Sequence, residues 1–208
     1  FRTEYLADFT STSRLVYYAF DKKANIKRFT DEPGRIWVGA DFNIDPMSAV
    51  VGTPVNGGFH IFDEIMLYNS NTHEMADELH RRYGPITIFP DPSGAARKTA
   101  SRGKSDHDIL REYGHSVKAP KAHSKVKDRN AVVNSMFRNA AGEHRLFVDP
   151  SCKRLIVSLA KHQYKADTMI PDKGLYDHAT DALAYVIDYN YSIHKTDRSN
   201  KPRKFGHI

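Results

Sequence analysis

The sequence has little of what marks secreted, membrane-spanning or zinc-binding proteins. Its single cysteine, Cys152, excludes an internal disulfide bond and fits a reducing compartment. One cysteine without paired histidines also argues against a zinc site. No apolar run approaches the length of a membrane span, and the opening stretch FRTEYLADFTS lacks the pattern of a signal peptide.

What the sequence does have is an ordinary apolar content and an excess of positive charge. Of its 208 residues, 40% are hydrophobic and 27% are charged, which is typical of one soluble domain. The net charge of +6 and the pI of about 9.3 favour a polyanionic partner, nucleic acid first, although many basic proteins bind nothing acidic. Because the chain begins with Phe rather than Met, we expect it to be a piece of a longer protein.

Three short apolar segments near the start predict an antiparallel meander. They span residues 36–40, 47–52 and 59–65, and a hairpin turn signal, PVNGG, separates the last two. Helical and extended patterns then alternate: the expected helices span 72–83, 105–113, 125–141, 149–161 and 179–191, and the expected strands span 86–89, 115–118 and 146–148. The order predicts an α/β fold whose central mixed sheet, three antiparallel strands and then parallel ones, is flanked by helices.

The sequence pattern also predicts three parts: a lead-in, a domain and a tail. Residues 1–33 have scattered apolar positions and form a lead-in that ends at a turn signal, DEPG. Residues 34–192 hold the regular pattern of one domain. Residues 193–208 are polar and basic, and we expect this tail to be disordered.

Three acids follow predicted elements in a way that suggests a metal site. Asp41 ends the first strand, Asp91 ends the fourth, and Asp181 lies near the start of the last helix. Neighbouring strands can bring Asp41 and Asp91 together, and a helix packed on the sheet can add Asp181. Three carboxylates in one place repel each other unless a cation lies among them. All-oxygen ligation suits Mg²⁺ or Mn²⁺, and two such ions hydrolyse phosphodiesters.

Each acid also has a structural explanation that stays open. Asp41 in DFNIDP and Asp91 in PDPSG can form turns. Asp181 can simply favour the positive end of a helix.

The segment KGLYDHATDALAYVID adds a histidine to these acids. Asp177, His178 and Asp181 share one face if the segment is helical. His178 could orient a water, touch a phosphate or bind a metal, or else Asp177 or His178 only caps the helix. Glu64, at the end of the third strand, could join the site, but a solvated strand end is the simpler interpretation.

Two basic segments lie near the predicted acids. The run Gly103-Lys-Ser105 lacks the glycine five residues earlier that a phosphate-binding loop needs, so we reject nucleotide binding there. We instead predict that both segments hold a nucleic-acid backbone, unless they are merely solvated loops. The residues concerned are Arg97, Lys98, Arg102, Lys104, Lys121, Lys125, Lys127 and Arg129.

Taken together, WVGADFNIDP, IFPDPSG and DHATDALAY resemble the nuclease domain of the large terminase subunit of tailed bacteriophages. The resemblance covers residues 1–191, and DH-x-x-DAL-x-Y is its most specific element. It implies a ribonuclease H-like fold and an endonuclease with two metal ions, Mg²⁺ or Mn²⁺, that cuts concatemeric viral DNA. It further implies Asp41, Asp91 and Asp181 as metal-binding catalytic residues and His178 as a catalytic site histidine.

The resemblance also implies the surroundings of the protein. Its partners would be double-stranded DNA, an ATPase motor domain upstream in the same polypeptide, the portal and the small terminase subunit, with no membrane. Its place would be the host cell cytoplasm rather than the mature virion. The motifs of the motor are absent from this sequence, so ATPase activity is not expected of it.

Two other functions remain compatible with the residues. Another nuclease of the same fold, a junction resolvase or a nuclease of RNA–DNA hybrids, would use the same acids. A non-catalytic DNA-binding module would use the basic segments alone, although the presence of all three acids counts against it.

Overall fold

The computed structural model describes residues 14–43, 45–97 and 103–192. Within them, six strands form one mixed sheet in the order β5-β4-β1-β2-β3-β6. The strands are β1 (Trp37–Asp41), β2 (Met47–Val55), β3 (Gly58–Leu67), β4 (Thr87–Pro90), β5 (Ser116–Val117) and β6 (Leu146–Val148). The strands β1, β2 and β3 are antiparallel, whereas β4, β5 and β6 join them in parallel. The predicted α/β mixed sheet is therefore confirmed.

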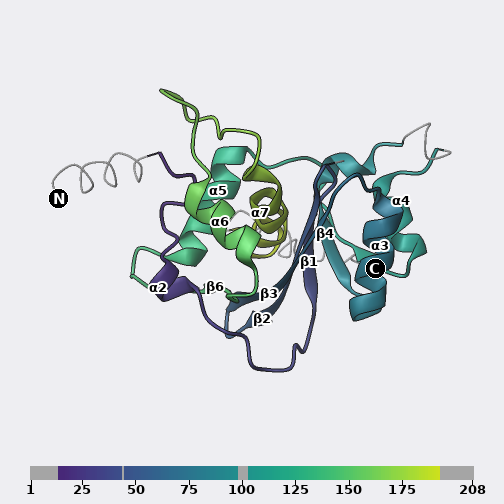
Figure 1. The fold of residues 1–208 in the computed structure, drawn as a ribbon, viewed down its shortest axis with the longest axis horizontal. Helices are drawn as coiled ribbons and strands as arrows, with labels where there is room; N and C mark the ends of the chain where they lie inside the picture. Colours follow the sequence, from purple (N-terminus) through teal and green to yellow (C-terminus); the bar gives the residue numbers. More distant parts are fainter. Residues whose placement is uncertain (1–13, 44, 98–102, 193–208) are drawn as a thin grey trace, which may run out of the picture.

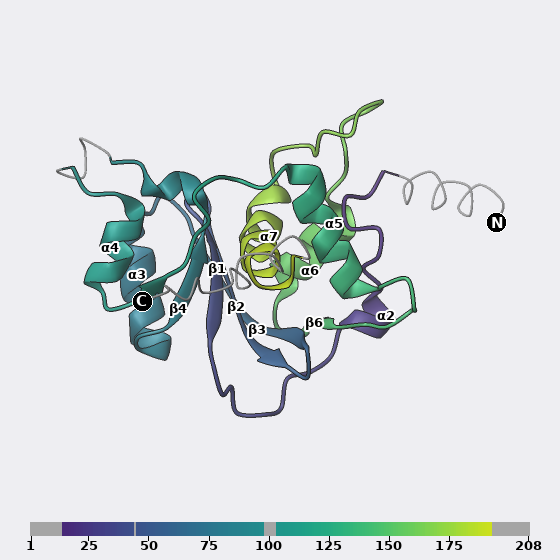
Figure 2. The ribbon, with the colours of Figure 1, turned by 180° about the vertical axis from the view of Figure 1, so that it is seen from behind.

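Helices cover both faces of this sheet (Figures 1 and 2). One face carries α5 (Val126–Phe137), α6 (Lys153–Lys161) and α7 (Asp177–Tyr191), and the other carries α3 (Thr72–Tyr83) and α4 (Asp106–Glu112). Two shorter helices, α2 (Lys22–Asn25) and the 3₁₀ helix η1 (Pro92–Ala95), complete the described elements. None of the described helices is long and apolar enough to cross a membrane.

Two hydrophobic clusters fill the layers, and strand alternation assigns the residues of β1 to them. Val38 and Ala40 pack in the cluster beneath α3 and α4. Because successive side chains point to opposite faces, Gly39 and Asp41 face α7. On the neighbouring strand β4, Phe89 packs on the α7 side, and so Asp91, two residues later, continues that face.

The β2–β3 hairpin shows how a local sequence sets the register. Asn56 and Gly57 have φ angles of 43° and 76°, the left-handed conformations that a two-residue hairpin turn requires. The strands therefore continue to Val55 and restart at Gly58, so both are longer than the expected 47–52 and 59–65. Backbone pairing extends each strand beyond its apolar run.

Helix boundaries differ from the expected ones where local turns take over. The helix expected to open at 149 begins instead at Lys153, because the Asp149 carboxylate accepts the Ser151 and Phe29 backbone N–H groups and folds that segment into a turn. The helix expected over 125–141 ends at Phe137. The last helix begins at Asp177, two residues early, which places Asp181 in its second turn.

The described part of the lead-in packs onto the helical layer. Val16 and Tyr17 are fully buried in the cluster beneath α5, α6 and α7. The Val16 backbone N–H donates to the His162 carbonyl, and the Asn134 side-chain amide donates to the Val16 carbonyl. The division into a lead-in, a domain and a tail stays a prediction, and residues 1–13 and 193–208 lie outside the described residues.

Gly39 sets the distance between β1 and α7. A Cβ atom at this position would lie 1.9 Å from the Ala182 carbonyl oxygen and 3.0 Å from a Val186 methyl. The first distance is far inside van der Waals contact and involves helix backbone, which cannot turn aside as a side chain can. The absence of a side chain at Gly39 thus lets α7 lie directly on the strand that ends in Asp41.

We predict that Gly39→Ala destabilises the fold by about 3 kcal/mol or more, the upper end of overpacking costs, because α7 must move off β1. Urea unfolding measures this change. Gly34→Ala is the matched control, since a Cβ there meets nothing within 4 Å. Equal midpoints for the two variants would contradict the close contact.

Candidate active site

The three acids singled out in the sequence line one cavity. Asp41 is the last residue of β1, and the Asp91 backbone N–H donates to the Ala40 carbonyl at 2.9 Å, which places Asp91 at the adjacent strand end. The helix α7 brings Asp181 over the same edge. The cavity has a volume of about 450 Å³. Its other walls include Asn43, Ser93, Lys173, Asp177, His178 and Tyr185.

Asp41 is buried and held by two polar neighbours. Asn43 donates its amide to Asp41 Oδ2 at 2.9 Å, and His178 Nδ1 lies 3.2 Å from the same oxygen. The Asn43 amide nitrogen is also 2.8 Å from His178 Nδ1. The hydrogen bond to Asp41 raises the pKa of His178 above its ordinary value, against the effect of burial. His178 therefore contacts the acid at the strand end.

Asp91 has both a turn contact and a contact with the loop before α5. Its Oδ1 accepts the Ser93 backbone N–H at 2.8 Å and so caps η1. This is the turn-forming role that the sequence also allowed for Asp91. The same oxygen lies 3.2 Å from His123 Nε2. The Asp91 carbonyl lies 2.9 Å from His107 Nε2. Strand, turn and two imidazoles fix the position of this residue.

Asp181 faces a buried arginine. Its Oδ1 lies 3.5 Å from an Nη atom of Arg129, in the first turn of α5. Burial raises the pKa of Asp181 to about 6; Arg129 opposes this increase, and the negative charges of Asp41 and Asp177 add to it. The last two contributions indicate that these carboxylates repel one another across the cavity.

Asp177 begins α7 without being its cap. It is the first helical residue, it is buried, and its Oδ1 accepts the Gly174 backbone N–H at 3.2 Å. Its other neighbour is His178, whose Nε2 lies 3.6 Å away. Asp177 thus ties the incoming chain to the helix start beside the acids.

The acids are paired with protein groups and are not arranged around a common centre. Among the described residues, no three His, Cys, Asp or Glu side chains could hold a metal ion as they stand. Asp41, Asp91 and Asp181 instead contact partners on different elements. A cation bound among them would require these carboxylates to exchange partners.

Glu64 lies outside this cavity and has a different partner. Its two carboxylate oxygens accept the backbone N–H groups of Arg154 and Leu155 at 2.8 and 2.7 Å. These groups belong to the first turn of α6, whose own N-cap residue supplies no side-chain hydrogen bond. Glu64 therefore caps a helix from a distant strand, which sequence spacing could not reveal.

The predicted nucleic-acid contacts fall into three groups. Arg97, Lys121, Lys125 and Lys127 are exposed, and Lys104 is exposed but paired with Glu112 at 2.7 Å. Arg129 is buried beside Asp181. Lys98 and Arg102 lie outside the described residues.

Sequence reasoning missed several residues that line the cavity. Asn43 follows Asp41 by two positions, and Tyr185 follows Asp181 by one helical turn, so spacing alone could have suggested them. Lys173 comes from a loop without periodicity, and no sequence signal placed it there. The same holds for His123, which contacts Asp91 from outside this cavity.

The fold defines an α/β class with a ribonuclease H-like mixed sheet, and it has close structural counterparts. The large terminase of a thermophilic bacteriophage, solved in complex with ATP-γ-S, superimposes with a TM-score of 0.69 and 18% identity, covering 85% of this chain and 45% of that one. The P22 large terminase nuclease domain gives 0.65 and 11%, covering 86% and 93%. The large terminase nuclease of thermophilic phage G20c gives 0.57 and 14%, covering 86% and 99%, and was also solved with bound cobalt.

These likenesses confirm at the level of fold the resemblance stated from the sequence. The chain has the fold of large terminase nuclease domains and spans less than half of the large terminase solved with ATP-γ-S. No protein-family model matches the chain, and no curated protein matches its sequence.

We predict that Glu64→Ala destabilises the protein by about 1–2 kcal/mol, because two N–H groups of α6 lose their acceptor. Thermal or urea unfolding measures the loss. Glu32→Ala, at an exposed position, is the control. If Glu64→Ala and the control have the same unfolding midpoint, Glu64 is not a helix cap.

Proposed function

We propose that this protein is a divalent-metal-dependent DNA endonuclease. The supporting observation is the convergence of Asp41, Asp91 and Asp181, from β1, the end of β4 and α7, in one polar cavity. A basic segment, residues 118–129, lines a neighbouring cavity that shares Asp91 and Asp181 with this one, and it supplies positive charge for a phosphate backbone.

The donor chemistry of the cavity suits Mg²⁺ or Mn²⁺. Three carboxylates supply only oxygen ligands, which these ions prefer. The raised pKa of Asp181 reflects negative neighbours as well as burial, and a divalent cation relieves both effects. In this proposal Asp41, Asp91 and Asp181 would together hold a pair of these ions. When bound, such a pair supplies an activated water and stabilises the leaving oxygen.

The remaining side chains of the cavity orient the reacting groups. Asn43 holds the Asp41 carboxylate by its 2.9 Å hydrogen bond. His178, in contact with the same carboxylate, positions the attacking water or the scissile phosphate. The exposed lysines at 121, 125 and 127 hold the DNA backbone without reading base sequence, because they contact phosphates and not base edges.

The terminase fold suggests the biological setting. We infer that the chain is the nuclease part of a large terminase, which cuts concatemeric viral DNA during genome packaging in the host cytoplasm. An ATPase motor domain would belong to the same polypeptide, and the portal and the small terminase subunit would be its partners. The support is the shared fold and the fraction of the ATP-γ-S-bound large terminase that the chain spans.

We predict that Asp41→Asn, Asp91→Asn and Asp181→Asn each lower the rate of plasmid cleavage about 100-fold or more, since each removes an anionic ligand. Relaxation of supercoiled DNA with Mn²⁺ or Mg²⁺ measures the rate, and chelation should abolish it. Asp31→Asn, at an exposed position, is the control.

Unchanged cleavage by all three variants would overturn the proposed site. His178→Ala belongs in the same series, and full activity would reduce His178 to a structural residue.

Four-way junctions and RNA–DNA hybrids as competing substrates distinguish a resolvase or hybrid nuclease from an enzyme of duplex DNA. Binding without cleavage under every metal condition would favour a DNA-binding module.

DNA binding should weaken steeply with salt, because lysine–phosphate contacts release counterions. We predict that the double variant Lys125→Met/Lys127→Met reduces the slope of log K against log[salt] by about 1.8, or about 0.9 for each lost contact. Fluorescence anisotropy with Ca²⁺ in place of Mg²⁺ measures it. Lys22→Met/Lys23→Met on α2 removes the same charge elsewhere, and an identical slope for the two doubles would place the DNA off the 118–129 segment.

A further inference from the structure

Arg129 is a buried cation whose hydrogen-bonding capacity is only partly used. Its residue is 5% exposed, and its Nε–H has no hydrogen-bond partner among the described residues. Its Nη atoms lie 3.5 Å from Asp181 Oδ1 and from the Ser124 carbonyl. Charge-assisted hydrogen bonds are usually about 2.7–2.9 Å long, so both contacts are weak.

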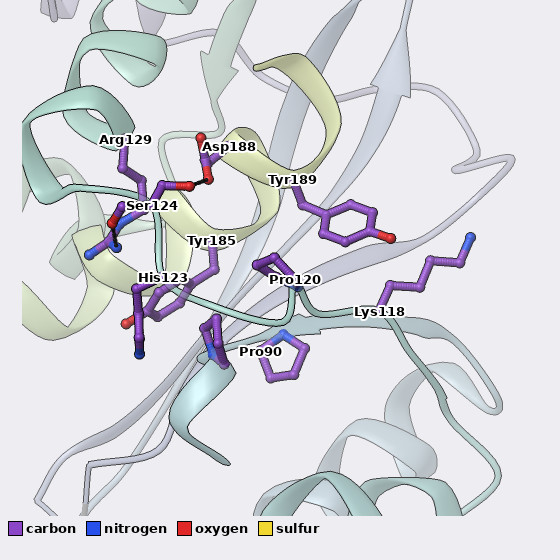
Figure 3. A pocket seen from close by; sticks show the side chains of 10 residues that line it. Pro90, Lys118, Pro120, His123, Ser124, Arg129, Tyr185, Asp188 and Tyr189 are labelled. Atoms are coloured by element: carbon purple, nitrogen blue, oxygen red, sulfur yellow. Dashed lines mark hydrogen bonds between the residues drawn. The ribbon is translucent and has the colours of Figure 1, made fainter. Parts of the chain in front are cut away.

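Packing, more than pairing, fixes the position of this guanidinium. It lies over the Tyr185 ring at 4.9 Å from the centroid. Figure 3 shows Arg129, His123 and Tyr185 gathered beside the Ser124–Asp188 hydrogen bond, which is 2.6 Å long and ties the loop before α5 to α7. The arginine is therefore held in place before any ligand arrives.

Arg129 lines a second cavity that shares part of its wall with the acid cavity. This cavity has a volume of about 300 Å³, and Asp91, Asp181 and Tyr185 are among the residues common to both. His123 and Val126 form part of its remaining wall. A DNA strand that passes over the acids can therefore continue along the second cavity.

The start of α5 lies at the wall of the second cavity. Val126 is the first residue of this 12-residue helix, and no side chain caps its N-terminus. The first-turn N–H groups therefore lack a side-chain acceptor, and the positive end of the helix dipole lies there. The helix start and the Arg129 guanidinium are thus independent sources of positive charge at the wall of one cavity.

The chemistry of these donors fits a phosphate group. A buried N–H without an acceptor destabilises the protein, and an anion bound to the guanidinium offsets that cost. The planar guanidinium matches phosphate oxygens better than an ammonium does, and helix N-termini bind phosphate. Asp91, Asp177 and Asp181 at the shared wall would repel an anion, and the divalent cations proposed above offset that negative charge.

We propose that Arg129, His123 and the N-terminus of α5 form a subsite for the DNA phosphate next to the one bound at the acids. The identity of the ligand as DNA rests on the proposed function. Arg129 holds the strand so that the neighbouring phosphate lies over Asp41, Asp91 and Asp181. This subsite recognises the backbone and requires no particular base.

The test uses thymidine 3′,5′-bisphosphate, whose two phosphates flank one nucleoside as successive DNA phosphates do. It is titrated into the chain with Ca²⁺ while the arginine Nε–H resonances are followed by ¹H–¹⁵N NMR. We expect the Arg129 resonance to shift and saturate. Arg129→Met should weaken binding about tenfold or more, and Arg129→Lys should restore only part of the loss.

Arg138→Met, at the exposed far end of α5, is the matched control and should bind as the parent does. The proposal is overturned if Arg129→Met also binds as the parent does, or if the probe saturates other residues while the Arg129 resonance stays still. If Arg129→Met does not fold, the resonance of the unaltered chain decides.

Plasmid cleavage by the parent separates the two proposals. Cleavage without a shift of the Arg129 resonance would overturn the proposed subsite and leave the proposed nuclease function intact. A shift of the Arg129 resonance without cleavage under any metal condition would leave the proposed subsite intact and overturn the nuclease function.

Discussion

The close contact between Gly39 of β1 and the backbone of α7 is the constraint on which the site depends. A side chain at Gly39 would overlap the Ala182 carbonyl, so the helix can reach the sheet only because none is present. Asp41 lies two residues further along the same face of β1, and Asp181 directly precedes Ala182. The contact that packs the core therefore also fixes the two acids relative to each other.

This arrangement places like charges together, and the protein compensates with partners from separate elements. Asn43 and His178 contact Asp41, His123 contacts Asp91, and Arg129 lies at a longer distance from Asp181. Asp181 has the weakest partner and a raised pKa, which burial and its negative neighbours explain. The negative charge of the site is therefore only partly compensated at Asp181, the position where the proposed function needs a cation.

Much of the architecture was predictable, because it rests on local rules. The helix over 72–83 has a strong apolar period and a glycine stop, and the Asn56-Gly57 turn specifies its hairpin. The acids were identifiable because strand ends and helix starts are readable positions. The parallel pairing of β1 and β4 brings Asp41 and Asp91 together, and the packing of α7 on β1 adds Asp181.

What sequence reasoning missed depends on contacts between distant segments. Glu64 was a candidate for the site, yet it caps α6 about 90 positions away. Arg129 was predicted to be one of several DNA-facing residues, and its burial against Tyr185 depends on how α5 packs on α7. Lys173 and His123 lie on loops, whose sequences have no periodicity that predicts which side chains lie beside the acids.

The central claim is that Asp41, Asp91 and Asp181 together form one divalent-cation site. The most direct measurement is anomalous diffraction from crystals of the chain bound to a short DNA duplex in the presence of Mn²⁺. The account predicts manganese peaks contacted by all three carboxylates, with Asp181 turned from Arg129 toward the metal. Manganese found only elsewhere on the protein, with the three carboxylates still on their present partners, would contradict it.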